Sequence, residues 1–226
     1  MNGQRLPGQA RRSRGQRRVK ATRQKLLEAA RAVFAEKGLD LTRIGEITDR
    51  ADVGKGTFYY HFKSKDQLIG ELIKSVLGEL VQVIAETCRG VTDLRHLLDT
   101  IINAHIQFFC KRWEDFVLYF QGRTDLTLQE GYEGLETPFL EYLQGMEALL
   151  ASVIAYRLPQ PVLRRIACAV AGFVSGYYSF AVVSSQEADI DATFASLRGA
   201  MVASLARFIQ EAAPATPTQE TASPTT

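Results

Sequence analysis

The chain has 226 residues, 46% of them hydrophobic, which suits one large globular domain or a small domain joined to a medium one. Its three cysteines, Cys88, Cys110 and Cys168, are far apart and form no Cys-x-x-Cys pair, which argues against a disulfide framework and against a zinc site. The net charge of +2 is unevenly divided, because residues 1–65 hold 16 Lys+Arg against 6 Asp+Glu, whereas residues 66–226 hold 11 against 19. This division favours a basic module that binds a polyanion, joined to an acidic module that does not, over a surface of merely uneven charge.

The first 20 residues carry seven Arg and Lys and no acid. No apolar segment follows them, as it would in a signal peptide, so export is not indicated and a cytoplasmic location is expected. We expect residues 1–19 to be a disordered basic arm. Such an arm either contacts DNA, along its phosphates or in a minor groove, or only aids solubility, and the sequence favours neither alternative.

Residues 22–67 have the pattern of short helices joined by tight connections. Apolar residues recur at helical spacing over 22–37, and Gly38 ends that helix. Thr42 suits the N-cap of a second helix, which residues 52–54 interrupt before a third, very short helix. Ser64 and Gln67 have the spacing of a capping box, which begins a long fourth helix that ends near residue 88 or 90. Two short helices joined by a turn and packed on a first helix form a helix-turn-helix.

The third helix has one apolar face and one face rich in hydrogen-bond donors. Phe58 and Phe62 are four residues apart, so on a helix they share the side that points into a core. The donors lie on the other sides: Lys55, Thr57, Tyr59, Tyr60 and His61. A short helix of this composition is suited to contact an anion.

The segment from Leu26 to Leu68 resembles the N-terminal domain of the tetracycline-repressor (TetR) family of bacterial regulators. The segments that carry the resemblance, in order and spacing, are Phe34-Ala35-Glu36-Lys37-Gly38, Glu46-Ile47-Thr48-Asp49-Arg50-Ala51 and Lys55-Gly56-Thr57-Phe58-Tyr59-Tyr60-His61-Phe62-Lys63-Ser64-Lys65. The match covers about a fifth of the chain, and its length makes coincidence improbable, whereas a lone helix-turn-helix pattern is a weak signal.

Two positions depart from the family pattern, which usually has Gly where Asp52 stands and Ser or Thr where Gly54 stands. The first position is expected to need a left-handed backbone, which Asp tolerates better than most other side chains. Gly54 offers no side-chain cap or hydroxyl donor, although its N–H remains. Gly45, inside the second helix, is expected to cost ~1 kcal/mol of helix stability relative to Ala.

The resemblance implies a DNA site on these helices. Gly54, Lys55 and Gly56 would approach a phosphate at the start of the third helix, and Thr57 would meet a phosphate or a thymine methyl group. Tyr59 would read a base edge. The remaining phosphate contacts implied by the family pattern are Tyr60, His61 and Lys65, with Thr42 at the start of the second helix and Lys63 as a weaker candidate. With the DNA site placed here, the basic arm is favoured as a second DNA contact.

Further helices are expected over the rest of the chain. Helical spacing predicts them over 94–113, 114–122, 137–157, 166–183 and 191–210, with a polar loop over 123–134 and a disordered tail over 212–226. Thr137 and Pro138 suit an N-cap followed by the first helical position. The almost uncharged stretch 166–183 is close to the length of a membrane span, but its small residues favour a buried helix at a subunit interface.

The fold class expected is therefore all-α, with about nine helices: a helix-turn-helix DNA-binding domain over 20–66 and an effector-binding and dimerisation domain over 67–211. The resemblance implies a homodimer formed through roughly 162–184 and 190–210, because one short helix covers too few base pairs alone. It also implies a pocket for a small apolar or aromatic effector, for which the candidate residues are His105, Phe109, Trp113, Tyr119, Tyr142 and Tyr177. Plain core packing is the alternative for each of these side chains.

The function favoured is a transcriptional regulator that binds a palindromic operator in double-stranded DNA and, as a repressor, is released by its effector. A ligand-independent regulator or an activator of the same fold is the alternative. An enzyme is disfavoured, because His61, His96 and His105 accompany no nucleophile motif and no metal-ligand spacing, and no catalytic residue, metal or cofactor is expected. A membrane-anchored regulator, resting on 166–183 alone, is also disfavoured.

Overall fold

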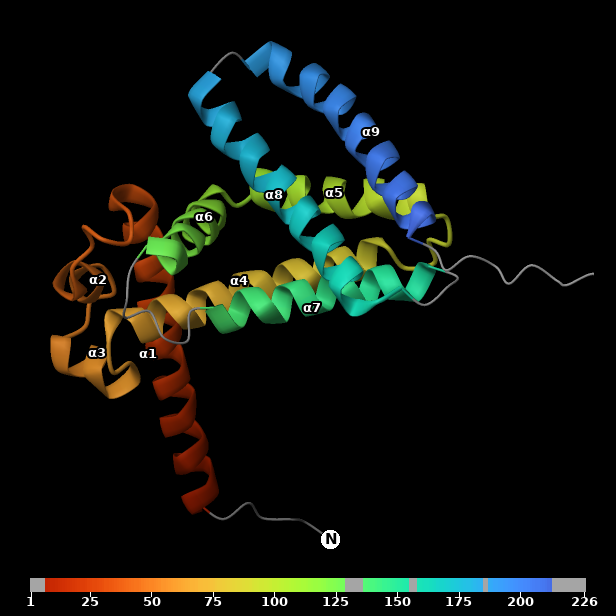
Figure 1. The fold of residues 1–226 in the computed structure, drawn as a ribbon. Helices are drawn as coiled ribbons and strands as arrows, with labels where there is room; N and C mark the ends of the chain where they lie inside the picture. The colour runs from red at the N-terminus through yellow and green to blue at the C-terminus, as the bar shows by residue number, and fades with distance from the viewer. Residues whose placement is uncertain (1–6, 129–135, 155–157, 185–186, 213–226) are drawn as a thin grey trace, which may run out of the picture. The chain divides into compact units, whose positions relative to one another are not determined.

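The computed structural model describes residues 7–128, 136–154, 158–184 and 187–212. Within these ranges it contains nine helices and no strand, which confirms the all-α class (Figure 1). The helices are α1 (Pro7–Lys37), α2 (Ile44–Arg50), α3 (Lys55–His61), α4 (Lys65–Thr87), α5 (Leu94–Cys110), α6 (Trp113–Leu128), α7 (Glu136–Val153), α8 (Gln160–Ser184) and α9 (Glu187–Glu211).

The chain forms two compact units, which divide it differently from the expected boundary at residue 66. The first unit comprises Met1–Val83 and Ile106–Tyr142, and the second comprises Ile84–His105 and Leu143–Thr226. The first unit therefore joins the helix-turn-helix to most of α4 and to α6. This happens because α6 packs on α1, so a later segment of the chain completes the core that supports the helix-turn-helix.

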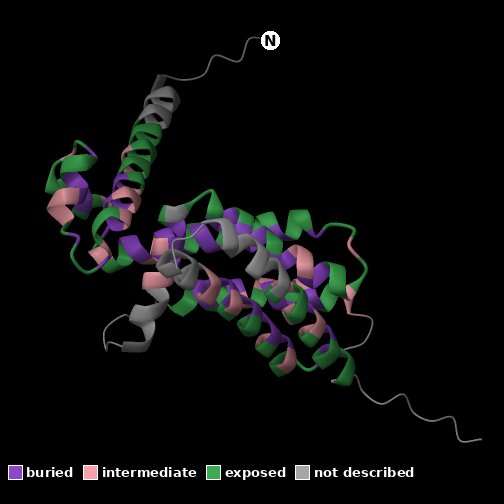
Figure 2. Ribbon diagram, turned by 90° about the horizontal axis from the view of Figure 1, so that it is seen from above, coloured by how far each residue is buried: buried purple, intermediate pink, exposed green. Residues whose placement is uncertain are grey.

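The core of the first unit is built from the apolar faces predicted by helical spacing. On α1 the buried face holds Leu26, Ala30, Val33 and Phe34, and on α4 it holds Leu68, Leu72, Ile73, Val76 and Leu80. Figure 2 shows buried and exposed residues alternating along the helices, as an amphipathic pattern requires. Each fully buried large side chain contributes about 1.5–3 kcal/mol relative to exposure.

In the second unit, α8 packs on α9. Ile166, Val170 and Val174 are spaced by four residues on α8 and are at most 1% exposed, and on α9 Val202, Ala206 and Ile209 are buried. No helix in the described ranges is long and apolar enough to cross a bilayer.

The expectation that residues 1–19 form a disordered arm is wrong for residues 7–19, which are the first part of α1. Residues 1–6 lie outside the described ranges. Pro7 occupies the first helical position, where its missing N–H has no cost, and the Arg, Gln and Ala residues that follow are good helix formers. Charge alone suggested disorder, whereas helix propensity and continuity with the packed part of α1 support the helix.

Other boundaries also differ from those expected. Helix α6 continues to Leu128, so the loop expected over 123–134 is wrong for 123–128, and 129–135 lie outside the described ranges. Helix α7 begins at Glu136, which places Thr137 inside the helix rather than at its N-cap, and it ends at Val153 rather than near residue 157. Helix α8 begins at Gln160, before the expected residue 166, and Pro161 lies in its first turn, where proline is tolerated. The tail expected over 212–226 lies outside the described ranges beyond residue 212.

A buried carboxylate connects α6 to α1 in the first unit. The side chain of Asp115 is 2% exposed, and its Oδ1 lies 2.9 Å from Nε of Arg31, although the two atoms do not have the angle of a hydrogen bond. Arg112 lies 3.6 Å from the other oxygen and also pairs with Glu79 of α4. Burial raises the pKa of Asp115, and the positive charges of Arg31 and Arg112 offset only part of that shift. The carboxylate is thus costly to bury, and it depends on its two arginines.

We predict that removing Arg31 lowers the free energy of unfolding more than removing the charge of Asp115 does. Arg31→Met should lower the free energy of unfolding by roughly 3 kcal/mol, because it leaves a buried carboxylate with the more distant Arg112 alone. Asp115→Asn removes the charge that is costly to bury, and Arg31 still reaches water, so it should cost less than about 1 kcal/mol. Urea denaturation measures both values. Lys74→Met, which removes one partner of the exposed pair Lys74–Glu141, is the control and should change stability by less than about 0.5 kcal/mol. Equal losses for Arg31→Met and Asp115→Asn would contradict this account.

Candidate nucleic-acid interface

Helix α3 is fixed by two phenylalanines and presents two tyrosines to solvent. Phe58 is 0% exposed and Phe62 is 1% exposed, whereas Tyr59 is 58% and Tyr60 is 73% exposed. The rings of Phe58 and Phe62 lie 5.7 Å apart, and the guanidinium of Arg23 stacks 5.0 Å above the centre of the Phe62 ring. The predicted inner and outer faces of α3 are therefore confirmed, and the outer face carries two large side chains that are not needed to pack the core.

The turn between α2 and α3 depends on one residue with left-handed backbone. Asp52 has a φ of 54°, the only positive φ of a non-glycine residue in the described ranges, which confirms the expectation for this position. The N–H of Val53 then bonds the carbonyl of Thr48 at 3.0 Å and closes the turn. Gly54 is the N-cap of α3 with φ −74° and ψ 152°, and its carbonyl accepts the N–H of Thr57 at 2.8 Å without a side-chain cap. Gly54 thus has ordinary extended backbone, and the turn relies on Asp52.

Gly45 of α2 lies close to the side chain of Lys55. A β-carbon built on Gly45 would stand 3.4 Å from Cε of Lys55, so the lysine side chain passes directly over α2. Gly45, which is expected to lower the stability of α2, thus lies where α2 and the first residue of α3 come close together. Lys55, Gly56 and Gly54 are exposed at the start of α3, and Thr57 is half-buried.

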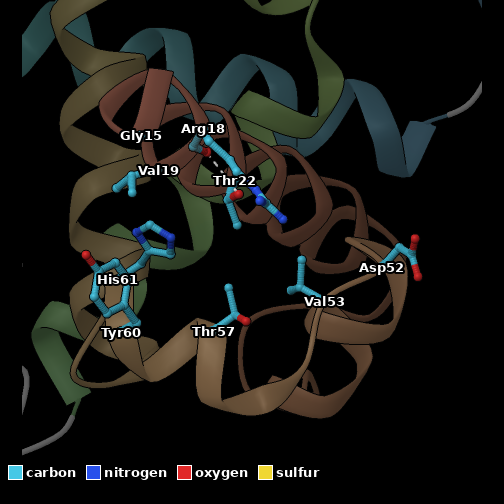
Figure 3. Close-up of a pocket in the computed structure, with 9 residues that line it drawn as sticks. All are labelled: Gly15, Arg18, Val19, Thr22, Asp52, Val53, Thr57, Tyr60 and His61. Carbon is cyan, nitrogen blue, oxygen red and sulfur yellow. Dashed lines mark hydrogen bonds between the residues drawn. The ribbon is translucent and has the colours of Figure 1, made fainter. Parts of the chain in front are cut away.

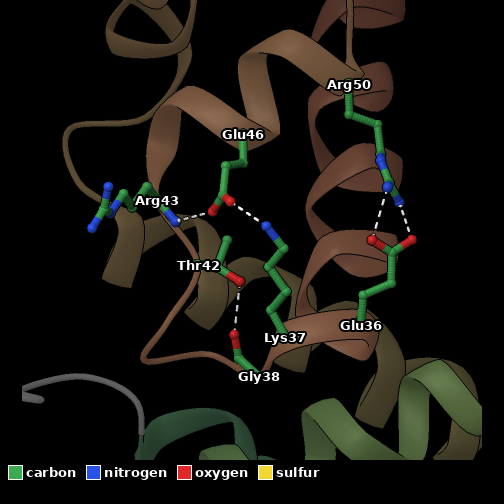
Figure 4. A network of polar contacts seen from close by, with 7 residues as sticks. All are labelled: Glu36, Lys37, Gly38, Thr42, Arg43, Glu46 and Arg50. Atoms are coloured by element: carbon green, nitrogen blue, oxygen red, sulfur yellow. Dashed lines mark hydrogen bonds and ion pairs between the residues drawn. The ribbon is translucent and has the colours of Figure 1, made fainter.

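Thr42 is not the N-cap of α2 that was expected, and its hydroxyl is engaged within the protein. The N-cap of α2 is Arg43, whose backbone N–H donates to Oε2 of Glu46 at 2.9 Å. Thr42 is 2% exposed, and its hydroxyl donates to the carbonyl of Gly38 at 2.7 Å (Figure 4). The hydroxyl is therefore used to close the end of α1 and presents no donor to a phosphate.

Lys65, which is predicted to contact a phosphate, binds backbone groups within the protein. Its Nζ donates to three backbone carbonyls of the loop between α1 and α2, those of Leu39 at 2.8 Å, Thr42 at 3.2 Å and Asp40 at 3.4 Å. An ammonium group has three donors, so these three acceptors can occupy all of them. The N–H of Leu39 bonds Oε1 of Gln121 from α6 at 3.0 Å. Lys65 and Gln121 thus hold the loop that positions α2.

The start of α4 confirms half of the expected capping box. The N–H of Gln67 donates to Oγ of Ser64 at 3.1 Å, as predicted. The Gln67 side chain reaches one residue further back, and its Oε1 accepts the N–H of Lys63 at 2.7 Å. The Lys63 side chain is exposed.

Two ion pairs tie α2 to the end of α1 (Figure 4). Arg50 binds Glu36 through two parallel hydrogen bonds of 2.5 and 2.8 Å, and Lys37 pairs with Glu46. The hydrogen bond from Arg50 holds the pKa of Glu36 below its ordinary value, and the hydrogen bond from Lys37 does the same for Glu46. These pairs are exposed, so they contribute orientation more than stability.

His61 is half-buried at the end of α3. Burial, and then the positive charge of Arg23, lower the pKa of His61 below its ordinary value of 6.5. The imidazole is therefore neutral in the free protein at pH 7. Neutral imidazole keeps one N–H donor, as a phosphate contact requires.

The six effector candidates do not form one group in the structure. In the first unit, Phe109 and Tyr119 are buried with ring centres 5.3 Å apart, and Tyr119 also contacts Phe139. Tyr142 of α7 is 3% exposed in the same unit. In the second unit, His105 is buried on α5 and Tyr177 is half-buried on α8. Trp113 begins α6, and its side chain lies outside the described ones. Their role in effector binding stays a prediction.

Sequence patterns missed the buried polar groups that accompany these aromatics. Asp115 is one, and Glu147 of α7 is another: it is 7% exposed, pairs with Arg164 of α8 and accepts a hydrogen bond from Gln160 at 3.2 Å. The one signal in the sequence was that each of these charged residues occupies a position where helical spacing predicts an apolar side chain. Spacing alone does not show whether such a residue is buried or lies at the solvent-exposed edge of the apolar face.

The comparisons with known proteins agree with this geometry. The family described as bacterial regulatory proteins of the tetR family matches residues 26–72, from the packed part of α1 into α4. The HTH-type transcriptional regulator YvdT of Bacillus subtilis (strain 168) is 30% identical over 132 residues, 58% of this chain and 66% of YvdT. The transposon Tn10 TetC protein of Escherichia coli is 30% identical over 145 residues, 62% of this chain and 68% of TetC. The chain thus spans about two thirds of the length of these relatives.

The fold is also that of solved regulators. The transcriptional regulator FadR from Bacillus subtilis, solved in complex with stearoyl-CoA, superposes with a TM-score of 0.60 at 20% identity, over 80% of this chain and 96% of FadR. At this identity the likeness concerns the fold alone.

We predict that Lys65 stabilises the helix-turn-helix through its three carbonyl partners. Lys65→Met should lower the free energy of unfolding by roughly 2 kcal/mol, because a charged donor is lost and partly buried carbonyls are left without it. Lys63→Met, which removes a nearby exposed lysine side chain, should stay within about 0.5 kcal/mol of the parent protein. Thermal or urea unfolding of the pair decides the matter, and equal stability of the two variants would refute the role assigned to Lys65.

We predict that His105 makes stability depend on pH. Burial lowers the pKa of His105 from 6.5 to about 4, while its Nδ1–H donates to the carbonyl of Ile101 at 2.7 Å. Between these two pH values the unfolded chain binds a proton that the folded protein does not, so the free energy of unfolding falls as the pH drops from 6.5 to about 4, by roughly 3 kcal/mol. His105→Asn should remove this part of the pH dependence.

Urea unfolding at several pH values measures the effect as the difference between the parent protein and His105→Asn. The raised pKa of Asp115 acts in the opposite direction but is common to both proteins, so it cancels. His96→Asn, on the exposed side of the same helix, is the control and should keep the parental pH dependence. The same slope in all three proteins would exclude a buried neutral His105.

Proposed function

The chain belongs to the tetR family of bacterial regulatory proteins, and from this premise we propose that it is a cytoplasmic repressor of transcription, which binds a palindromic operator as a homodimer and leaves it when a small apolar or aromatic effector binds. The observation that carries the proposal is the outer face of α3. Two tyrosines project into solvent from a helix whose other face is locked into the core by Phe58 and Phe62.

The outer face of α3 suits the major groove of DNA. The helix has seven residues and is about 10 Å long, which fits a groove about 12 Å wide. Tyr59 would meet base edges, whereas Lys55 and Tyr60 would meet phosphates on either side. Tight backbone geometry at Asp52 and the pairs Arg50–Glu36 and Lys37–Glu46 fix α3 relative to α1, so these side chains would be positioned before DNA arrives.

A helix of this length touches only a few base pairs, so recognition of a unique site requires a second copy. A two-fold dimer would bring two α3 helices to half-sites about one helical turn apart, and the operator would be palindromic. The proposed interface lies on α8 and α9, within the ranges 162–184 and 190–210. The exposed leucine and phenylalanine of α9, Leu197 and Phe208, would be covered in such a dimer.

The effector is proposed to bind among the aromatic side chains of the C-terminal part, with His105, Phe109, Trp113, Tyr119, Tyr142 and Tyr177 as candidates. Because FadR of Bacillus subtilis, which has the same fold, is solved with stearoyl-CoA, acyl-CoA esters join aromatic compounds in the panel of ligands to be tried. An effector that releases the operator need shift the DNA affinity by a coupling free energy of only about 1–3 kcal/mol.

Selection of bound duplexes from random sequence tests the proposal. We expect the selected sites to share an inverted repeat, and a compound of the panel to release them. Selected sites without symmetry would contradict the dimer. Persistent DNA binding in the presence of every compound would indicate a ligand-independent regulator. Failure to retain any duplex would overturn DNA binding altogether.

We predict different losses for the two exposed tyrosines of α3. Tyr59→Ala should lower the preference for the selected site over random DNA by about 1–3 kcal/mol, because a base contact carries sequence information. Tyr60→Ala should weaken both kinds of DNA by a similar factor, because a phosphate contact does not. Titration of each variant with both duplexes gives the two ratios. If Tyr59→Ala also weakened both duplexes equally, its role as the base reader would be excluded.

A further inference from the structure

A hollow of about 550 Å³ lies between the N-terminal part of α1 and the helix-turn-helix (Figure 3). Helix α1 contributes Gly15, Arg18, Val19 and Thr22 to its lining, helix α3 contributes Thr57, Tyr60 and His61, and the turn contributes Asp52 and Val53. The hollow is open to solvent, and both of its long walls are helices of the first unit. It therefore has the form of a groove that runs beside α3 rather than a closed pocket.

The lining of the groove includes several hydrogen-bond donors and one cation. Arg18 lies on the wall formed by α1, and the hydroxyls of Thr57 and Tyr60 with the imidazole of His61 lie on the wall formed by α3. The single carboxylate, Asp52, is exposed at the edge of the hollow, and in Figure 3 it points away from Arg18 and His61. The potential inside the groove therefore favours an anion.

The cations of this part of α1 are not engaged elsewhere. Arg17, Arg18 and Lys20 are exposed and have no carboxylate partner among the described residues, in contrast to Arg23, which pairs with Glu71. No acid occurs from Pro7 to Leu27. Unpaired arginines along an exposed helix keep it soluble, and they create a positive electrostatic field that no nearby acidic side chain neutralises. The charge is thus available to an external polyanion.

The position of the groove identifies that polyanion. The N-terminal part of α1, residues 7–25, precedes the segment matched by the family and adds about 28 Å of helix to it. One wall of the groove is α3 itself, which under the proposed function lies in the major groove. The sugar-phosphate strands of DNA border the major groove, so a strand must pass beside α3, where this groove lies.

We propose that the groove between the N-terminal part of α1 and α3 seats one phosphodiester strand at the border of the half-site, and that Arg18 holds this strand from the side opposite Thr57, Tyr60 and His61. This inference rests on the proposed function. It adds a DNA contact formed by a preformed basic helix outside the helix-turn-helix, and it makes no contribution to base recognition.

The test compares two charge-removing variants of α1. Arg18→Gln removes the cation that lines the groove, whereas Lys20→Gln removes an exposed cation two residues on, which leaves the helix on the opposite side. For each dimer the two copies of Arg18 contact two phosphates. Arg18→Gln should therefore weaken binding to the selected site and to random DNA alike, and reduce the slope of log affinity against log salt by about 1.8. Lys20→Gln should keep the parental slope.

Phosphate ethylation interference locates the contact. We expect one backbone position in each half-site whose ethylation blocks the parent protein and Lys20→Gln but not Arg18→Gln. Circular dichroism confirms that α1 keeps its helix in both variants. A parental slope and parental interference pattern for Arg18→Gln would overturn the inference while leaving the proposed function intact, because the selected site would still be bound. Loss of DNA binding by the parent protein would instead overturn the proposed function.

A free anion is the other source of the same chemistry. If inorganic phosphate bound the DNA-free parent protein but not Arg18→Gln, while both proteins kept the same salt slope and the same interference pattern on DNA, the groove would be a site for a free anion, and the strand contact proposed here would be wrong.

Discussion

The backbone of the loop between α1 and α2 depends on hydrogen-bonding groups from two other helices. Lys65 of α4 supplies donors to the carbonyls of Leu39, Asp40 and Thr42, and Gln121 of α6 accepts the N–H of Leu39. Leu39 is 4% exposed, so water cannot replace these bonds without opening the loop. Since α2 begins immediately after this loop, the placement of the helix-turn-helix is set by α4 and α6. A shift of α6 that removed the Gln121 bond would cost about 1–3 kcal/mol, the size of a typical allosteric coupling.

The buried carboxylate of Asp115 acts on the same helices in a different way. It is costly to bury, its hydrogen-bond geometry with Arg31 is incomplete, and it depends on Arg112, which is shared with Glu79 of α4. Such an arrangement adds little net stability, because desolvation offsets most of the attraction. It does fix the register of α6 against α1 and α4, since any other register would leave the charge without a partner. Lys65 and Gln121 then transmit that register to the loop, so the position of α2 follows from where α6 sits.

The sequence predicted what local chemistry determines. The apolar pair Phe58 and Phe62, the exposed tyrosines and the left-handed backbone at Asp52 all follow from spacing or from the preferences of single residues, and the structure confirms them. The hydrogen bonds of Lys65 and Thr42 were not predicted, because their partners, the carbonyls of Leu39 and Gly38, are identified only by the folded path of the chain. Asp115 pairs with Arg31, which lies 84 positions earlier in the sequence, and Gln121 binds Leu39, which lies 82 positions earlier. No local pattern in the sequence indicates such distant pairs. The N-terminal helix was missed because its charge was weighed above its helix propensity.

That last difference changes the physics of the proposed DNA contact. A disordered arm would lose conformational entropy on binding, about 1–2 kcal/mol for each residue that becomes ordered, which would offset much of the attraction between its arginines and phosphates. In α1 the same residues are already helical and continuous with the segment that carries Leu26, Val33 and Phe34 into the core. Arg18 is therefore held at a fixed place beside α3 before DNA binds, and its attraction to a phosphate is reduced by the ordering of only one side chain. A rigid clamp of this kind favours one spacing between the strand in the groove and the bases that α3 meets, which a flexible arm would not do.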